Sequence, residues 1–433
     1  MLSLEQCIQK KFLVFGLGIS GNATLSQLKK NKANIECWDD SKQLREKFKN
    51  RYRVNKDWFK SNYDFIVISP GINIYSHSKK SFFQKNKNKI ITDLDLFCSS
   101  IKDQKVILVT GTNGKSTMCK LIYDLLKNSK KKVYIGGNYG TPVLNLPYKE
   151  KSAIFVLELS SYQLDYSLRL TSSVSILLNI SPDHIERHKS FEKYILAKLK
   201  IFKGLTQTGK GFLDLSNDNQ SKIFKVLKSA KYNQRNIQLI KKNINHHIKD
   251  SLISAALKGR HFNNCLYITL QISKLFKISK KIYLKTIKDF SGLSHRQEII
   301  KIKNNLTFVN DSKATNFAST EVALNNYKNI HWIVGGIAKE KDKITIKKFK
   351  RSILKAYIIG KNVNFFLRQI KNTIKYNVSH FLKNALLSAL SETKKNPNLK
   401  QVILLSPSAA SFDQYKNFEH RGNTFKQLVK KYS

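Results

Sequence analysis

The chain has 433 residues, of which 41% are hydrophobic and 11% aromatic, an ordinary globular composition that predicts about two to four domains. Its formal net charge of +49 would favour a nucleic-acid or anionic-membrane partner. However, the excess is almost all lysine and is spread along the whole chain, and no element concentrates arginine and aromatic residues as specific nucleic-acid readers do. We therefore attribute the charge to a compositional drift toward lysine, asparagine and isoleucine, which would still attract phosphorylated substrates.

The cysteines and the apolar stretches predict a cytoplasmic protein. Five cysteines are scattered and no CxxC pair occurs, which argues against a disulfide framework or a zinc knuckle. The stretch FLVFGLGI near the N-terminus is too short for a signal peptide and runs into a glycine turn. No apolar run approaches the roughly 20 residues that a membrane-spanning helix needs.

Three successive runs of strand and helix patterns predict an α/β fold with doubly wound parallel sheets. The first run alternates strand-like segments such as KFLVFG and YDFIVISPGI with a helix that opens on glycine. The second begins at IKDQKVILVTGTNGKST and continues through the buried strands of SAIFVLELSS and SVSILLNIS. The third follows SGLSHRQEI and ends in the helix NTFKQLVKKY. The points at which the pattern restarts predict three domains, over residues 1–95, 96–294 and 295–433.

The first run carries a glycine-rich turn. Gly16, Gly18 and Gly21 make a complete G-x-G-x-x-G, and Asp39 or Asp40 follows about twenty residues later. The glycines let the backbone approach phosphate, the helix N-terminus supplies N–H donors, and the acid can hold a ribose hydroxyl. One interpretation is an NAD-linked oxidoreductase, and another is a tight strand–helix turn without a ligand. We favour a third, the diphosphate of a UDP-sugar, because no hydride-transfer site follows.

The second run carries a different loop, GTNGKST, between the strand VILVT and a helix. Its backbone N–H groups can surround the β- and γ-phosphates of ATP, Lys115 adds a positive charge, and Ser116 or Thr117 can reach Mg²⁺. The match to G-x-x-x-x-G-K-[ST] is imperfect because Val109 stands in place of the first glycine. The alternative is a fortuitous glycine-rich turn.

Two later segments offer metal ligands. Glu158 ends the strand of FVLELSS, where a carboxylate could hold Mg²⁺ at the carboxyl edge of a sheet. In NISPDHIERH, Asp183, His184 and His188 resemble ligands, and the two histidines are four residues apart. The zinc-protease pattern would need glutamate where Ile185 stands. We expect His188 to be a solvated residue on a helix face rather than a ligand.

Seven segments, in order, resemble the Mur ligase family: GTNGKST, ELSSYQL, NISPDHIERH, AKLKIF, GLSHRQE, NDSKATN and LLSPSAASFDQYKNFEHRG. The resemblance covers essentially the whole chain, with residues 215–260 as its weak part. It implies an N-terminal Rossmann-like domain for a UDP substrate, a central P-loop domain for ATP, and a C-terminal Rossmann-like domain that binds an amino acid and closes on ATP. GLGISG, SPGI and the closing SFDQYKNFEHRG resemble the members that add D-glutamate to UDP-N-acetylmuramoyl-L-alanine.

The implied reaction is ATP-dependent amide-bond formation through an acyl phosphate, with release of ADP and phosphate. It belongs to cytoplasmic peptidoglycan precursor synthesis, and so to cell-wall biogenesis, cell shape and cell division. The implied cofactors are ATP and two Mg²⁺ ions, and the partners are small-molecule substrates of a monomer, without nucleic acid or membrane insertion. Cations are needed because two anionic groups must meet. A related ligase that adds glutamate to folate would share GTNGKST but would not need GLGISG, SPGI or KNFEHRG.

The resemblance also implies the roles of single residues. Lys115 would contact the β- and γ-phosphates, and His184 would bind the second Mg²⁺. Lys198 matches a lysine that the family carbamylates, which requires a neutral amine that burial helps to provide; Lys200 is the neighbouring competitor. Lys115, His184, Lys198 and Lys313 make the catalytic set. The metal ligands would be Ser116, Thr117, Glu158, His184 and Lys198, and the ATP site would comprise Gly111, Thr112, Asn113, Gly114, Lys115, Ser116, Thr117, Arg296 and Asp311.

The substrate residues follow from the same resemblance. The UDP substrate would contact Ser20, Asp39, Ser69, Pro70, Gly71 and Asn138. D-glutamate would contact Thr315, Lys339, Ser411 and Phe418, and a cation such as Lys339 suits its distal carboxylate. One stretch departs from the family's His-Asn-x-x-Asn near the adenine. It reads GRHFNNC from Gly259 to Cys265, with Phe262 and Cys265 at the asparagine positions.

Overall fold

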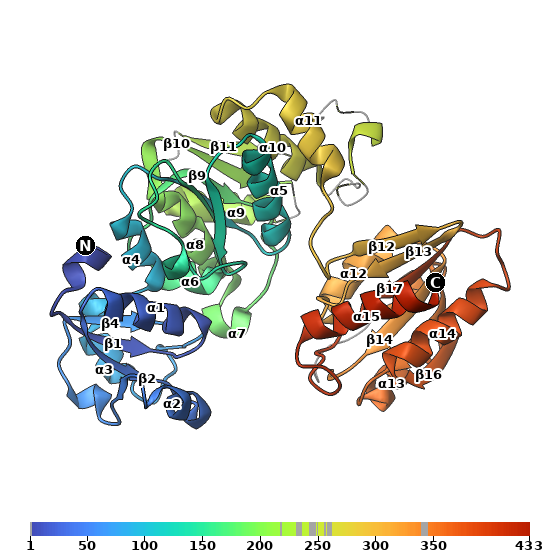
Figure 1. Cartoon of the computed structure of the whole chain (residues 1–433), viewed down its shortest axis with the longest axis horizontal. Helices are drawn as coiled ribbons and strands as arrows, with labels where there is room; N and C mark the ends of the chain where they lie inside the picture. The colour runs from blue at the N-terminus through green and yellow to red at the C-terminus, as the bar shows by residue number, and fades with distance from the viewer. Residues whose placement is uncertain are drawn as a thin grey trace. The chain divides into compact units, whose positions relative to one another are not determined.

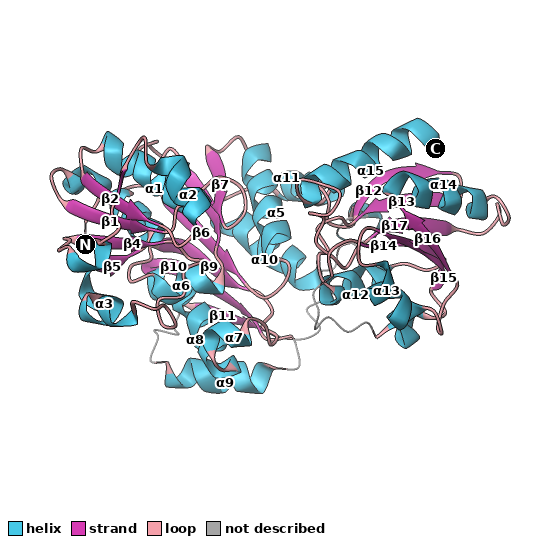
Figure 2. Ribbon diagram, turned by 90° about the horizontal axis from the view of Figure 1, so that it is seen from below, coloured by secondary structure: helices cyan, strands magenta, loops and turns pink. Residues whose placement is uncertain are grey.

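The computed structural model forms two compact units (Figure 1). One unit comprises residues 1–248 and 261–288, and the other comprises residues 249–260 and 289–433. Described in the structure are residues 2–216, 219–230, 236–241, 248, 250–254, 257, 262–338 and 345–433. Across these ranges the strands assemble into three sheets, drawn in magenta in Figure 2.

The first sheet has five parallel strands in the order β3-β2-β1-β4-β5. Its central strand β1 is buried from Phe12 to Phe15, as expected for a parallel strand covered on both faces. The strands are β1 (Lys11–Phe15), β2 (Asn34–Trp38), β3 (Arg53–Val54), β4 (Phe65–Ile68) and β5 (Ile90–Ile91). The helices are η1 (Leu4–Cys7), α1 (Ile19–Lys30), α2 (Lys42–Phe48), η2 (Trp58–Lys60), α3 (Lys80–Lys85), η3 (Lys87–Lys89) and α4 (Asp93–Ser100).

The second sheet has six parallel strands in the order β11-β10-β9-β6-β8-β7. Its strands are β6 (Lys105–Thr110), β7 (Val133–Gly137), β8 (Ile154–Glu158), β9 (Ser172–Leu177), β10 (Leu205–Asp214) and β11 (Ile237–Ile240). Its helices are α5 (Lys115–Asn128), η4 (Val143–Asn145), α6 (Ser161–Tyr166), α7 (Ile185–His188), α8 (Phe191–Leu199), η5 (Lys200–Gly204), α9 (Gln220–Ser229), α10 (Asn263–Leu275) and α11 (Lys280–Asp289). The carboxyl ends of the parallel strands lie at one edge, where α/β sheets place their ligands.

The first two sheets share one hydrophobic core, which explains why they form a single unit. Helix α4 supplies much of the contact, and the ring of Phe97 meets that of Phe155 in β8 edge-on, with centroids 5.1 Å apart. The start of α4 is held by a capping box, in which Thr92 and Asp95 bond each other's backbone N–H groups. Both glycine-rich loops therefore belong to one packed body.

The third sheet forms the core of the second unit, in the order β12-β13-β17-β14-β15-β16. All neighbours are parallel except β12 and β13, which are antiparallel. The strands are β12 (Glu298–Lys303), β13 (Leu306–Asn310), β14 (Ile330–Gly335), β15 (Ile353–Ile359), β16 (Tyr376–His380) and β17 (Gln401–Leu405). The helices are η6 (Asp250–Leu252), α12 (Phe317–Asn326), η9 (Ile346–Phe349), α13 (Val363–Ile370), α14 (Leu382–Thr393) and α15 (Phe418–Tyr432).

These sheets confirm the predicted α/β fold with parallel sheets. The domain boundaries near residues 95 and 294 stay a prediction. All five cysteines are buried and free. In the described ranges, no helix is both long and apolar enough to cross a membrane.

The turn between β1 and α1 depends on two of its three glycines. A Cβ on Gly21 would lie 1.8 Å from the carbonyl oxygen of Gly16, and Gly16 itself has φ +98°. A Cβ on Gly18, the N-cap of α1, would meet no atom within 4 Å. The turn thus tolerates a side chain at the middle glycine but not at the third.

We expect Gly21→Ser to lower the free energy of unfolding of the first unit by about 2 kcal/mol or more, because backbone must move to admit the new side chain. Gly18→Ser is the matched control and should change it by less than about 0.5 kcal/mol, since serine suits an N-cap. Chemical denaturation of both variants measures the difference. Equal losses at the two positions would contradict the turn geometry.

Candidate active site

The loop GTNGKST requires glycine at two positions. Gly114 adopts φ +80° as the N-cap of α5, in the left-handed region that favours glycine. A Cβ on Gly111 would lie 2.8 Å from the Cβ of Leu178. The loop can therefore pass close over the end of β9 and present the N-terminus of α5, where free N–H groups favour an anion.

The segment after β9 braces this loop. Asn179 accepts a hydrogen bond from the Thr112 N–H at its carbonyl oxygen (2.8 Å) and one from the Asn113 N–H at its side-chain oxygen (2.9 Å). The Ser181 N–H donates to the Thr112 hydroxyl at 3.1 Å. The Lys115 ammonium folds back over the loop and donates to the carbonyl oxygens of Gly111 (3.0 Å) and Thr112 (2.9 Å).

A buried carboxylate lies beside the loop. Glu158, at the end of β8, is 2% exposed. Its Oε2 accepts a hydrogen bond from the Ser116 hydroxyl, and its Oε1 accepts one from the Asn138 amide at 2.7 Å. A carboxylate next to a hydroxyl is an oxygen donor set of the kind that Mg²⁺ prefers. The predicted residues Ser116, Glu158 and Asn138 therefore lie together.

Lys198 reaches the same loop from α8. It is 2% exposed, and its ammonium donates to the Gly111 carbonyl at 2.8 Å and lies 3.4 Å from the Thr110 hydroxyl. Burial, and then the positive charge of Lys115, hold the pKa of Lys198 well below its usual range, which favours the neutral amine. Lys200 instead contacts the backbone carbonyl and the carboxylate of Asp165. Of the two lysines, only Lys198 lies at the loop.

His184 lies near these residues but is half exposed. It adopts φ +53° as the N-cap of α7, and its Nδ1 lies 3.0 Å from the Tyr162 hydroxyl. Its Nε2 lies 3.5 Å from a carboxylate oxygen of Asp183, and Asp183 also acts on the pKa of Lys198. No group of three His, Cys, Asp or Glu side chains gathers around a metal position among the described residues. A metal here would therefore depend on hydroxyl oxygens and a modified lysine as well.

The expectation of a solvated His188 was wrong. The side chain is 6% exposed, and its Nε2 lies 3.0 Å from the Ser161 hydroxyl. Burial lowers the pKa of its imidazole. The error arose because spacing within one helical turn does not reveal that α6 packs against it.

The turn GLGISG brings two predicted substrate residues, Ser69 and Asp39, together. The Ser69 hydroxyl donates to the Gly16 carbonyl at 2.8 Å. Asp39 is buried, and its two oxygens accept hydrogen bonds from the backbone N–H groups of Leu17 (2.7 Å) and Ser41 (2.8 Å). Asp39 thus ties the glycine turn to the start of α2.

The other predicted residues of this group are more dispersed. Ser20 lies in α1 and hydrogen-bonds Asp93, a carboxyl whose pKa burial raises to about 6. Pro70 and Gly71 form the turn closed by the Ile72 N–H and the Ser69 carbonyl, 3.0 Å apart. Asn138 lies with Glu158 at the second sheet, as described above.

In the second unit, the predicted site carboxylate Asp311 is buried. Its Oδ2 accepts a hydrogen bond from the Ser406 hydroxyl at 2.7 Å, and its Oδ1 accepts one from the Gln297 N–H at 3.1 Å. Burial raises the pKa of Asp311 to about 7, although the positive charge of Arg296 acts to lower it. Arg296 and Asp311, both predicted to contact ATP, therefore lie close together.

Lys313 and Phe418 also meet, with the ammonium 3.8 Å from the centre of the ring. The Phe418 carbonyl accepts a hydrogen bond from the Ser312 hydroxyl at 2.9 Å. Ser411 is buried and Thr315 is partly buried. Lys339 lies outside the described residues.

Sequence reasoning missed two buried residues that shape these sites. Arg421, 1% exposed, donates to the hydroxyl and carbonyl oxygens of Ser312 and to the Ala409 carbonyl. The closing motif KNFEHRG contained it, but no role was assigned. Tyr194 places its hydroxyl 3.1 Å from that of Thr112 and its ring 4.9 Å from the Lys198 ammonium. An aromatic residue in an apolar helix pattern is typical of core packing, so the sequence offered no signal for Tyr194.

The stretch that departs from the family's adenine pattern is described in part, since His261 lies outside the described residues. Cys265 is buried. The amide of Asn264 donates to a carboxylate oxygen of Asp214 (2.8 Å) and to the Ser216 hydroxyl (2.9 Å). Of the two asparagines between the expected positions, Asn264 is therefore engaged in hydrogen bonds within the fold.

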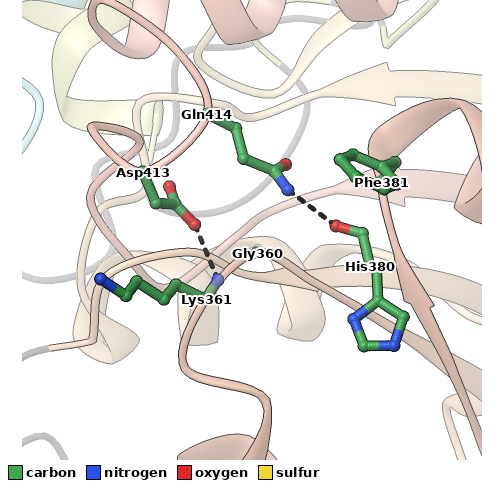
Figure 3. Close-up of a pocket in the computed structure, with 6 residues that line it drawn as sticks. All are labelled: Gly360, Lys361, His380, Phe381, Asp413 and Gln414. Carbon is green, nitrogen blue, oxygen red and sulfur yellow. Dashed lines mark hydrogen bonds between the residues drawn. The ribbon is translucent and has the colours of Figure 1, made fainter.

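A cavity of about 310 Å³ lies at the carboxyl ends of β15 and β16 (Figure 3). The Asp413 carboxylate accepts a hydrogen bond from the Lys361 N–H at 2.8 Å, and the Gln414 amide donates to the His380 carbonyl at 3.0 Å. None of the predicted site residues lines this cavity.

Asp311 predicts a pH dependence of stability. Its folded pKa lies above the unfolded value of 3.8, so its favourable contribution is complete below about pH 4 and is lost as the pH rises through about 7. We expect the melting temperature of the second unit to fall less steeply between pH 4 and pH 7 in Asp311→Asn than in the wild type. Calorimetric scans across this range measure both slopes, and identical slopes would contradict the burial of an ionisable group here.

Known proteins resemble the chain along its whole length. A family model described as "Mur ligase middle domain" matches residues 109–283. The chain is 34% identical to a UDP-N-acetylmuramoylalanine–D-glutamate ligase of Rickettsia prowazekii, with 98% of each chain covered. Among solved structures, MurF from Acinetobacter baumannii superposes with a TM-score of 0.59 at 13% identity, covering 99% of this chain and 93% of that one.

MurF ligase from Thermotoga maritima, solved in complex with ADP, superposes with a TM-score of 0.55 at 16% identity, covering 100% of this chain and 98% of that one. At such identities the solved structures support the fold alone. The near-full-length identity to the Rickettsia enzyme goes further, and the sequence segments quoted above agree with it. The chain therefore belongs to the Mur ligase family.

Proposed function

We propose that the protein joins D-glutamate to UDP-N-acetylmuramoyl-L-alanine by way of an acyl phosphate, with release of ADP and phosphate from ATP. The observation that carries the proposal is the convergence of Lys115, Lys198 and the Ser116–Glu158 pair on one loop at the carboxyl edge of the second sheet. Relatives named for this reaction support it over nearly the full length of the chain. We propose further that the protein acts as a monomer in the cytoplasm.

The loop from Gly111 to Thr117 would hold the phosphates of ATP. The N-terminus of α5 offers free N–H groups and the positive end of the helix dipole. In the present structure, the Lys115 ammonium donates hydrogen bonds to two carbonyl oxygens of the same loop. When phosphates occupy the loop, its ammonium would turn to the β- and γ-oxygens, where it offsets the charge that develops during transfer.

Ser116, Thr117 and Glu158 would hold one Mg²⁺, and His184 with a carbamylated Lys198 would hold a second. Bound there, the ions would screen the repulsion between the substrate carboxylate and the γ-phosphate. The fit rests on chemistry that the fold already provides. The Glu158 carboxylate is buried against a hydroxyl, and His184 presents its ring at the exposed end of α7.

Carbamylation would resolve an unfavourable charge arrangement. Lys115 and Lys198 both donate to the Gly111 carbonyl, so two amines whose charged forms would repel each other lie close together. A neutral Lys198 amine can add to carbon dioxide, forming an N–C bond and releasing one proton, which leaves a carbamate anion. The product would pair with Lys115 instead of repelling it.

The remaining predicted residues would bind the substrates. Ser20, Asp39, Ser69, Pro70, Gly71 and Asn138 would hold the UDP substrate. Arg296, Asp311 and Lys313 would reach ATP from the second unit. Thr315, Lys339, Ser411 and Phe418 would hold D-glutamate. The links from Ser69 and Asp39 to the glycine turn support the first group, and the neighbouring positions of Arg296 and Asp311 support the second.

An omission assay tests the proposed reaction. Purified protein receives UDP-N-acetylmuramoyl-L-alanine, D-glutamate, ATP and Mg²⁺, and phosphate release is followed with each component left out in turn. We expect turnover only in the complete mixture, because the amine must capture the acyl phosphate to complete the cycle. Replacement of D-glutamate by L-glutamate is the control. Phosphate release that does not respond to D-glutamate would refute the proposal.

Lys198 and Lys200 form a matched pair of variants. We expect Lys198→Ala to lower kcat by at least about 100-fold, because it removes the anion that would hold Mg²⁺. Millimolar acetate or formate should restore part of the activity by replacing the carbamate. Lys200→Ala should retain most of the activity, since Lys200 contacts Asp165 rather than the loop. Full activity of Lys198→Ala, or equal losses in both variants, would contradict the carbamate role.

A further inference from the structure

Arg187 lies on α7, three residues after His184, and is surrounded by aromatic rings. Its guanidinium carbon lies 5.0 Å from the ring centre of Tyr166, 5.2 Å from that of Tyr162 and 5.9 Å from that of Tyr75. At these distances each ring face attracts the cation. The three tyrosines come from α6 and from the segment after the Ser69–Gly71 turn, so the side chain spans two parts of the first unit.

One side of this cluster holds the segment after the Ser69–Gly71 turn. Arg187 Nη2 donates to the Tyr166 hydroxyl and to the Ile72 carbonyl, the latter at 3.3 Å. The Tyr166 hydroxyl donates to the same carbonyl at 2.9 Å and accepts from the Ile74 N–H at 3.2 Å. Arg187 and Tyr166 together fix residues 72–74 through main-chain contacts.

The other side of the cluster holds His184. The Tyr162 ring that stacks on Arg187 also lies 5.0 Å from the imidazole, and its hydroxyl lies 3.0 Å from His184 Nδ1. A hydrogen bond to one ring nitrogen sets the orientation of a histidine and the availability of its other nitrogen. Arg187 therefore contacts both the segment beside the predicted substrate turn and the residue that orients His184.

The charge of Arg187 has no carboxylate partner within 4.0 Å among the residues that the structure describes. Its Nη1 is buried and makes no hydrogen bond in those residues. A buried unpaired donor is destabilising, so a neutral packing residue would serve core stability better. A cation at this position is explained if it also benefits an anionic substrate on the neighbouring turn.

We propose that Arg187 is a positioning residue of the ligation reaction. It holds residues 72–74 in a fixed relation to Tyr162 and His184, so that a diphosphate-linked sugar bound on the Ser69–Gly71 turn delivers its carboxylate to the metal side of the site. This role rests on the proposed function. A displacement of residues 72–74 by about 1 Å relative to His184 would lower the rate up to about 100-fold.

The test uses Arg187→Ala and Arg187→Lys in the full chain. Lys193→Ala is the matched control, because Lys193 is an exposed cation in the first turn of the neighbouring α8. We expect Arg187→Ala to lower kcat about 10- to 100-fold and to raise KM for UDP-N-acetylmuramoyl-L-alanine. KM for ATP should change less than about twofold, and the Mg²⁺ concentration for half-maximal rate should rise. Arg187→Lys should recover only part, since lysine keeps the charge but not the planar fork.

A purely structural role predicts a different pattern, in which the melting temperature falls and KM for ATP worsens along with KM for the UDP substrate. That pattern would overturn the proposal, as would kinetics of Arg187→Ala within twofold of the wild type. Calorimetric titration with UDP-N-acetylmuramoyl-L-alanine, without ATP, separates the two proposals. If the wild type binds the substrate and Arg187→Ala binds it more weakly, the positioning role is supported. If the two proteins bind the substrate equally and have equal kinetics, the positioning role is refuted but the proposed function is not. A wild type that does not bind this substrate refutes the proposed function and the positioning role together.

A double-variant cycle tests the link to His184. Tyr162→Phe removes the hydroxyl at His184 Nδ1 but keeps the ring that stacks on Arg187. If both residues act through the orientation of His184, the double variant should lose less activity than the product of the two single losses. Multiplicative losses would overturn the proposed coupling.

Discussion

Two lysine ammonium groups share one backbone carbonyl, that of Gly111, and much of the candidate site depends on this arrangement. Like charges repel strongly where water is excluded, and burial together with Lys115 favours the neutral form of Lys198. The carbonyl can accept both donors because Gly111 lets the loop pass close to Leu178. A side chain at residue 111 would move the carbonyl and separate the two amines. The carbamylation proposed for Lys198 thus depends on the absence of a side chain at Gly111.

Much of the fold could be predicted from the sequence because buried parallel strands have a recognisable pattern: short apolar runs bounded by glycine and polar residues. VILVT and FVLELSS became β6 and β8, with Glu158 at the expected edge. The seven family-like segments then located candidate side chains such as Ser116 and Lys198. The antiparallel pairing of β12 with β13 was not predicted, since alternation of apolar residues does not report strand direction.

The helical spacing of apolar residues in the sequence does not predict which helices contact one another. His188 was expected at the surface, but Ser161 and two tyrosine rings cover it. Tyr194 and Arg421 escaped notice because Thr112 and Ser312, which they contact, lie 82 and 109 residues away in the sequence. Asp39 illustrates a subtler case. Its spacing from the glycine turn is typical of a ribose ligand, but both of its oxygens accept backbone N–H groups, so part of the pattern reflects the internal support of the turn.

The hydrophobic core shared by the first two sheets ties the glycine turn of one sheet to the lysine loop of the other. Packed interiors resist compression and stretching, so the span between these two loops is nearly constant on the timescale of a reaction. A substrate held at both ends would then be selected by its length as well as by its functional groups. If the glycine turn holds the nucleotide sugar and the lysine loop holds ATP, as proposed, shorter or longer sugars would not bring their carboxylate to the γ-phosphate, and the first unit would act as a ruler of substrate length.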